Sequence, residues 1–216
     1  MSITLAVIAK EPVAGRVKTR LCPPCTPEQA AAIAEAALHD TLAAVAATPA
    51  ARRLCVLDGR PGAWLPAGFD VIPQVTGGLD DRLAAAFAAA DGPMFLVGMD
   101  TPQITRSLLE ASTNALLREG SDAVLGMTHD GGYWGIGLRD GSDPDLIRGV
   151  PMSRDDTGAK QLERLLERGL VVDVGLPFLT DVDHMSEARA VARLAPRGRF
   201  ARAVQMVDAS REEVAA

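Results

Sequence analysis

Apolar runs of strand length alternate with amphipathic or alanine-rich segments along most of the chain. Ile3–Ala9 and Met94–Val97 are continuously apolar, which is typical of parallel strands that are covered on both faces. Pro73 interrupts a further run, and it indicates an edge strand because proline cannot donate a hydrogen bond to a neighbouring strand. Strands are expected over residues 3–9, 53–57, 69–75, 94–97, 122–126 and 170–174.

The longest helical pattern begins at Thr26, which has the features of an N-cap. Pro27 would take the first helical position, and Gln29 would complete a capping box with Thr26. The alanine-rich segment that follows favours a helix to about Ala47. Further helices are expected over residues 79–90, 105–119, 157–168 and 186–195.

The alternation of strands and helices predicts a doubly wound α/β fold with a mostly parallel sheet and helices on both faces. A chain of 216 residues with 48% hydrophobic side chains is long and apolar enough to bury a sizeable core. No repeat or low-complexity linker divides it. We therefore expect a single domain over residues 1–216, with a C-terminal helical tail at 196–216.

Charge and cysteine content narrow the functional class. The formal net charge of −6 argues against a general attraction to nucleic acid or to an anionic membrane. No apolar stretch is expected to reach the roughly 20 residues that cross a bilayer. Three cysteines cannot form a disulfide framework, which favours a reducing compartment. The sequence thus predicts a cytoplasmic α/β enzyme.

The loop after the first strand concentrates positive charge. It carries Lys10, Arg16, Lys18 and Arg20 together with Gly15, and it holds two of the three lysines in the chain. Ligands of parallel α/β sheets gather at the carboxyl ends of the strands, where backbone donors and mobile cations suit a polyphosphate. The spacing fits neither a Walker A loop nor G-x-G-x-x-G. The alternative is a solvated basic loop.

Three aspartates are candidates for metal binding. Asp100 directly follows a buried strand, where a carboxylate can hold a divalent cation against phosphate oxygens. Asp181 and Asp183 alternate in an extended segment, so both can face one site. The alternatives are a helix-capping role for Asp100 and an acidic turn ahead of the helix at 186–195.

The glycine-punctuated segment 129–138 is expected to form an antiparallel ribbon or a ligand loop rather than a core strand. Four glycines surround Tyr133 and Trp134, which implies that the backbone closely approaches a ligand or another part of the chain. A ligand wall is favoured over a tight hairpin.

Several of these motifs, in this order, resemble a bacterial glycosyltransferase-like family, some members of which are linked to arsenosugar biosynthesis. They are residues 9–21 (AKEPVAGRVKTRL), 98–102 (GMDTP), 130–138 (DGGYWGIGL) and 181–188 (DVDHMSEA). The family is similar to the guanylyltransferases that make 2-phospholactate-guanosine diphosphate and the molybdenum-cofactor dinucleotide. The resemblance covers residues 3 to about 190 and implies a nucleotide-diphospho-sugar transferase fold of the GT-A type, which is Rossmann-like.

The motifs and the resemblance together assign expected roles to four groups of residues. The residues expected to act in catalysis are Lys18, Arg20 and Asp100. Those expected to bind a nucleotide are Lys10, Gly15, Arg16, Lys18, Arg20, Gln74 and Arg82. Those expected to bind the acceptor are Asp130, Gly131, Gly132, Tyr133 and Ser153. The expected ligands of Mg²⁺ or Mn²⁺ are Asp100, Asp181 and Asp183.

The chain departs from the family pattern at two places. Relatives carry serine or another small polar residue beside the metal-binding aspartate, whereas this chain has Met99. The segment 151–153 lacks the aromatic residue of the family, so the identity of the acceptor does not carry over.

The expected activity is transfer of a nucleoside monophosphate from a triphosphate to a phosphorylated small molecule, with release of pyrophosphate. The alternative is a glycosyltransferase that uses a nucleotide sugar and takes Asp130 as its base. A nucleotide-binding protein without activity is a third hypothesis. The expected partners are a nucleotide and a small-molecule acceptor, without nucleic acid or membrane, and a homodimer is left open.

Overall fold

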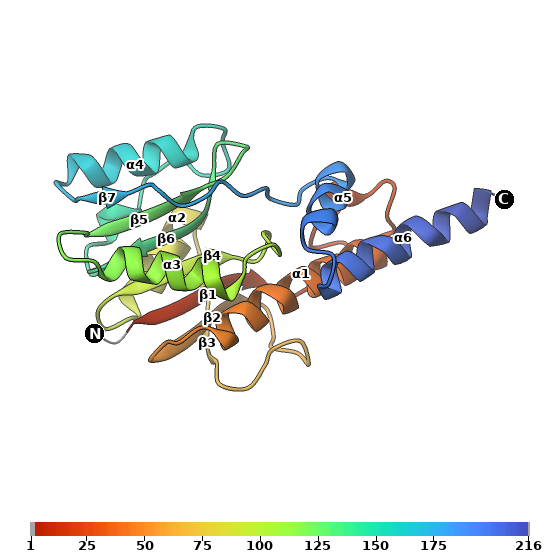
Figure 1. Ribbon diagram of the computed structural model, residues 1–216, viewed down its shortest axis with the longest axis horizontal. Coiled ribbons are helices and arrows are strands. Elements are labelled where there is room, and N and C mark those ends of the chain that lie inside the picture. The colour runs from red at the N-terminus through yellow and green to blue at the C-terminus, as the bar shows by residue number, and fades with distance from the viewer. Residues whose placement is uncertain (1–2, 216) are drawn as a thin grey trace.

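The computed structural model describes residues 3–215 and shows one seven-stranded sheet with helices on both faces (Figure 1). The strand order is β3-β2-β1-β4-β6-β5-β7. The strands are β1 (Thr4–Lys10), β2 (Arg52–Asp58), β3 (Asp70–Pro73), β4 (Met94–Gly98), β5 (Ala123–Met127), β6 (Tyr133–Leu138) and β7 (Val172–Asp173). All neighbouring pairs are parallel except the two that β6 makes with β4 and β5.

The helices follow the strands in the alternation that the sequence predicts. They are α1 (Pro27–Ala47), α2 (Leu79–Ala88), α3 (Arg106–Leu117), α4 (Thr157–Glu167), α5 (Met185–Leu194) and α6 (Arg199–Ala215). Thr26 caps α1, because its side chain accepts from the Gln29 backbone N–H while the Gln29 side chain accepts from the Thr26 N–H. The predicted capping box is confirmed.

Alternate residues of the strands supply two separate apolar cores. Leu5 and Val7 of β1 face the core that α1 and α3 cover, whereas Ala6 faces the core on the opposite side, covered by α2 and α4. This two-sided burial explains why β1, β2 and β4 are continuous apolar runs in the sequence. The predicted mixed α/β fold with a mostly parallel sheet is confirmed.

The segment 129–138 has the expected antiparallel direction, but it corrects the expectation that it is not a core strand. Its second half is β6, a buried antiparallel strand between β4 and β5, and therefore a core strand. A side chain at Gly135 or Gly137 would collide with the ring of Phe95, and one at Gly126 would collide with Trp134. The glycines thus make room for the packed rings of Phe95 and Trp134, whose centroids lie 5.8 Å apart.

Helices α5 and α6 pack on α1 at one end of the molecule (Figure 1). Asp40 of α1 accepts hydrogen bonds from the backbone N–H groups of Arg199 and Phe200, so it caps the beginning of α6. The division of the chain into one domain and a tail at 196–216 stays a prediction.

Helix α1 also corrects an expectation about membranes. With 21 residues and a mean hydropathy of 1.3, it is long and apolar enough to cross a bilayer by length and composition. Half of its most apolar window is buried inside the protein, against β1, α3 and α6. Its apolar character is therefore explained by packing within this fold.

Candidate functional site

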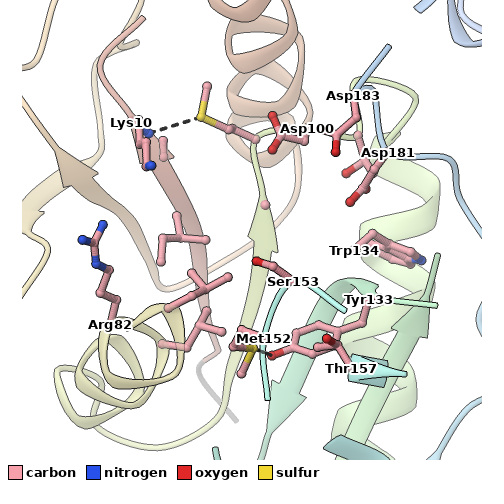
Figure 2. Close-up of a pocket in the computed structure, with 18 of the residues that line it drawn as sticks. Lys10, Arg82, Asp100, Tyr133, Trp134, Met152, Ser153, Thr157, Asp181 and Asp183 are labelled. Carbon is pink, nitrogen blue, oxygen red and sulfur yellow. Dashed lines mark hydrogen bonds between the residues drawn. The ribbon is translucent and has the colours of Figure 1, made fainter. Parts of the chain in front are cut away.

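A pocket of about 770 Å³ opens at the carboxyl ends of β1 and β4. Its lining includes every predicted site residue except Gly15 and Gly131. Figure 2 shows Lys10 and Arg82 on one side, Asp100, Asp181 and Asp183 on another, and Tyr133 beside Ser153 on a third. Segments from distant places in the sequence therefore meet at this edge of the sheet, as expected for a parallel α/β fold.

Adjacent strands place the first two functional groups side by side. Ile8 of β1 pairs with Gly98 of β4, so the chain leaves both strands at the same level. The backbone N–H of Lys10 then donates to the sulfur of Met99 over 3.2 Å (Figure 2). Met99, which departs from the family pattern, is buried and joins the two strand ends.

The basic loop is anchored by apolar side chains and presents its cations to the pocket. Val17 and Leu21 are buried, and the backbone between them adopts the left-handed conformation at Lys18 (φ 47°). The side chains of Lys10 and Arg16 are exposed and make no hydrogen bond or ion pair with any residue that the structure describes. Two cations are thus available to an anionic ligand.

Gly15 lies in the same loop with φ 75°, in the left-handed region that favours glycine. It does not line the pocket. Its position shapes the loop, and its predicted contact with a nucleotide stays a prediction.

The three predicted metal ligands come together on the opposite side. The backbone N–H of Val182 donates to the Asp100 carbonyl over 3.1 Å, which ties the acidic segment to the end of β4. Val182 is buried, so Asp181 and Asp183 on either side of it both face the pocket (Figure 2). The expectation that alternate positions place these carboxylates at one site agrees with this geometry.

Lys18 lies among these carboxylates. Its ammonium nitrogen is 2.7 Å from Asp100 Oδ1 and 3.3 Å from Asp183 Oδ1, and Arg20 Nη1 lies 2.7 Å from the other oxygen of Asp183. Burial by itself lowers the pKa of Lys18, but the attraction of Asp100 and Asp183 outweighs it and the pKa is raised. Lys18 is therefore held in its charged form.

Asp181 has no such partner. Its carboxylate makes no hydrogen bond or ion pair with residues 3–210, whose side chains the structure describes. Burial, followed by repulsion from Asp100 and Asp130, raises the pKa of Asp181 to about 7. The cluster of Asp100, Asp181 and Asp183 thus has three carboxylates and only two contacting cations, Lys18 and Arg20.

This donor set fits a hard divalent cation. Mg²⁺ and Mn²⁺ prefer carboxylate oxygens, and Asp100, Asp181 and Asp183 supply them around an excess of negative charge. Over the described range, however, no three acidic, histidine or cysteine side chains are already grouped closely enough to hold a metal ion. Lys18 takes part of the space between two of these carboxylates.

Gln74 and Arg82 form one unit in the part of the pocket next to the ends of β1 and β2. The Gln74 amide donates to the carbonyls of Ala9 and Val56, at 2.8 and 3.0 Å, so it ties the ends of β1 and β2 together. Its oxygen accepts from Arg82 Nη1 at 3.0 Å, and Asp58 lies 3.4 Å from the same nitrogen. Gln74 lines the pocket, but its polar atoms bind other groups of the protein. Its side-chain oxygen holds Arg82, which also lines the pocket.

Asp130, one of the residues expected to bind an acceptor, is fixed by its neighbours. Its Oδ1 accepts from the Thr128 hydroxyl at 2.5 Å and from the Gly132 backbone N–H at 3.1 Å. Gly131 (φ 90°) lies so close to the Asp155 carbonyl that a side chain could not fit, and it is outside the pocket lining. The close approach that its sequence position implied is to the protein's own backbone.

The sequence did not single out Arg154, Asp155 and Thr157, which also line the pocket. They follow Ser153, whose backbone is left-handed (φ 58°), and they lead into α4. The N–H of Gly158 donates to the Gly131 carbonyl over 2.8 Å, so α4 begins against the turn that holds Asp130. Their position directly after Ser153 in the sequence is the signal that could have identified them.

Comparisons with known proteins agree with the fold. The family described as "Uncharacterized protein conserved in bacteria (DUF2064)" matches residues 31–154. No curated protein matches the chain. A provisionally named nucleotide-diphospho-sugar transferase from Desulfovibrio desulfuricans G20 has a similar structure, with a TM-score of 0.85 and 26% identity over 97% of this chain and 96% of that one.

Two more distant structures share the fold. Rv0371C from Mycobacterium tuberculosis H37Rv, in complex with manganese, has a TM-score of 0.53 and 19% identity over 89% of this chain and 98% of that one. The 2-C-methyl-D-erythritol 4-phosphate cytidylyltransferase from Thermus thermophilus has a TM-score of 0.53 and 18% identity over 91% of this chain and 100% of that one. The solved neighbours include transferases, as expected from the sequence.

Proposed function

The chain belongs to the DUF2064 family, and from that premise and the geometry of the pocket we propose that it is a metal-dependent nucleotidyltransferase. It would transfer a nucleoside monophosphate from a nucleoside triphosphate to a phosphorylated small molecule. The observation that carries this proposal is the placement of two unpaired cations, Lys10 and Arg16, in one pocket with a cluster of carboxylates. A triphosphate with its metal ion has the complementary charge pattern.

The metal would be Mg²⁺ or Mn²⁺, held by Asp100, Asp181 and Asp183. When bound, such an ion neutralises charge on phosphate oxygens and favours an in-line displacement. The manganese complex of Rv0371C, which shares the fold, supports a divalent ion in proteins of this shape. The excess negative charge around Asp181 supports it in this chain.

The residues of the basic loop would hold the triphosphate. Lys10 and Arg16 have no other partner in the described chain, and Lys18 and Arg20 lie at the boundary between the loop and the carboxylates. A phosphate oxygen of the acceptor attacks the α-phosphorus, the bond from that phosphorus to the bridging oxygen of the β-phosphate breaks, and pyrophosphate leaves with the electron pair. The cations stabilise the charge that gathers on the leaving pyrophosphate. No protein nucleophile is needed.

The acceptor would lie near Asp130, Gly132, Tyr133 and Ser153. The resemblance to the 2-phospholactate and molybdenum-cofactor guanylyltransferases supports a phosphorylated acceptor. We further propose a cytoplasmic location, because three cysteines cannot form a disulfide framework. We also propose that two copies of the chain can form a homodimer.

A glycosyltransferase is the second candidate, and two observations favour it. The structural neighbour from Desulfovibrio desulfuricans G20 carries the name of a nucleotide-diphospho-sugar transferase. Asp130 lines the pocket and is held through Oδ1, while no residue of the described chain bonds its Oδ2. That oxygen could accept a proton from an acceptor hydroxyl.

Thermal stabilisation of the purified protein distinguishes the two. The panel holds the four nucleoside triphosphates and the UDP-, GDP- and dTDP-sugars, each with and without Mg²⁺. A ligand that binds the native state raises the melting temperature according to its affinity. A metal-dependent shift with a triphosphate, followed by pyrophosphate release in an acceptor screen, supports nucleotidyl transfer. A shift with nucleotide sugars alone supports glycosyl transfer and overturns the first proposal.

A further inference from the structure

The ammonium group of Lys18 contacts carboxylate oxygens that a bound metal ion would also need as ligands. Its ammonium nitrogen approaches one oxygen of Asp100 at 2.7 Å and one oxygen of Asp183 at 3.3 Å. These two aspartates are two of the three proposed metal ligands. A hydrogen-bonded ammonium and a metal ion such as Mg²⁺, which binds oxygen ligands at about 2.0–2.1 Å, cannot use the same side of these oxygens together.

The fold holds Lys18 in this place firmly. The Lys18 side chain is only 8% exposed, whereas the Arg20 side chain on the outer oxygen of Asp183 is 68% exposed. The turn Thr19–Leu21 follows directly, and the buried side chain of Leu21 anchors it. Lys18 is therefore a built element of the carboxylate cluster and not a surface residue that happens to lie near it.

Lys18 neutralises only part of the negative charge of the carboxylate cluster. One ammonium group serves Asp100 and Asp183, and Arg20 adds a contact from solvent, while Asp181 has no cation within the described chain. A divalent ion would neutralise the cluster better, but only by separating Lys18 from both partners. A released ammonium in this pocket would then need a new anion.

Resting on the proposed function, we propose that Lys18 is a resident counter-ion that a divalent metal must displace from Asp100 and Asp183. The released ammonium passes to the phosphates of the nucleotide, which arrive on the side of Lys10 and Arg16. The metal alone therefore binds weakly, because it must leave Lys18 unpaired. Metal and nucleotide together bind strongly. The metal frees Lys18 to contact the phosphates, and the phosphates neutralise the ammonium that the metal has displaced.

Replacing Lys18 should move two affinities in opposite directions. Mn²⁺ alone should bind Lys18→Met at least about tenfold more tightly than the unaltered protein, because nothing competes for the carboxylates. The triphosphate should bind that variant at least about tenfold more weakly, because a phosphate contact is lost. Electron paramagnetic resonance of free Mn²⁺ measures the first affinity, and calorimetry measures the second. A merely structural role for Lys18 would not tighten metal binding.

Two controls isolate the displacement. Lys10→Met removes the same charge from the pocket without touching a carboxylate, so it should tighten Mn²⁺ binding by no more than about two- to threefold. Lys18→Gln keeps a hydrogen-bond donor and provides a second variant if Lys18→Met does not fold. Asp100→Asn should abolish tight Mn²⁺ binding in the Lys18→Met background.

The chain has three lysines, so the unaltered protein offers a direct readout. Lysine labelled with ¹³C at Cε gives three signals, and Lys160, paired with Glu163 on the surface, serves as the reference. Mg²⁺ added with a non-hydrolysable triphosphate should shift the Lys18 signal, and Mg²⁺ alone should shift it only at much higher concentration.

The outcomes separate the two proposals. If Lys18→Met and Lys18→Gln bind Mn²⁺ no more tightly than the unaltered protein, while Asp100→Asn weakens its binding, the metal site stands and the displacement is overturned. If Asp100→Asn changes Mn²⁺ binding in no background, the metal assignment of the proposed function fails as well.

Discussion

The guanidinium of Arg82 lies 3.0 Å from the side-chain oxygen of Gln74, whose amide nitrogen is bound to the carbonyls of Ala9 and Val56. Gln74 thus connects the ends of β1 and β2 to a cation that lines the pocket. Arg82 supplies the charge that lines the pocket, and Gln74 sets its direction.

This relationship predicts different results for the two residues. Arg82→Met should weaken triphosphate binding by about tenfold, with little change in melting temperature, because its contacts are partly exposed. Gln74→Met should lower the free energy of unfolding by about 1–3 kcal/mol, since two carbonyls lose their donor. Calorimetry and urea unfolding check the pair. Triphosphate binding that Gln74→Met leaves unchanged would contradict the positioning role.

Asp100 should be required for metal-dependent binding but not for folding. Its side chain is 42% exposed, and Lys18 retains Asp183 when Asp100 is changed. Asp100→Asn should remove the Mg²⁺-dependent part of the thermal shift with a triphosphate. Asp173→Asn, on a carboxylate paired with Arg118 and absent from the pocket lining, is the matched control and should keep the shift. Unchanged Mg²⁺ dependence in Asp100→Asn would exclude it as a ligand.

Gly126 should tolerate no side chain. A Cβ atom there would lie 2.3 Å from the ring of Trp134, which is packed between the sheet and its covering layer. Gly126→Ala should therefore destabilise the fold by about 1–3 kcal/mol. Gly98→Ala, where a Cβ meets nothing within 4 Å, is the control and should change the unfolding midpoint little. Equal melting temperatures for the two variants would show that the ring moves aside.

Asp40 should stabilise the attachment of α6. Its two carboxylate oxygens accept from the backbone of Arg199 and Phe200 at 3.1 and 2.9 Å. Asp40→Ala should cost about 1 kcal/mol, as expected for loss of a helix cap, and should increase amide exchange in the first turn of α6. Asp40→Asn retains an acceptor and should lose less. Unaltered exchange in Asp40→Ala would exclude the cap.

Cys55 should be unreactive in the native protein. It is fully buried in β2, and burial raises the pKa of its thiol to about 11. Its thiolate fraction at pH 8 is therefore about 100-fold below that of a thiol with the ordinary value of 9.0. Cys22, which is partly exposed, should react first with an aromatic disulfide reagent, and Cys55 should react only after unfolding. Rapid native labelling at Cys55, identified by peptide mapping, would contradict this.

The sequence determined the features that local physics controls. The continuous apolar run of β1 predicts a strand covered on two faces, and Thr26 with Gln29 predicts the start of α1, because both depend on residues a few positions apart. The cations of the loop after β1 and the alternation of Asp181 with Asp183 were also visible, since a strand end and an extended segment fix which way neighbouring side chains point.

Only the tertiary structure decided which distant groups meet. The glycines of β6 read as a ribbon or a ligand loop because their sequence does not show Phe95 and Trp134, the rings that fill their space. Likewise, a lysine that looks like a phosphate ligand in the sequence lies between Asp100 and Asp183, and Gln74 is engaged by Ala9, Val56 and Arg82. Side-chain partners across the sheet follow from strand order, and strand order is set by global packing that no local pattern encodes.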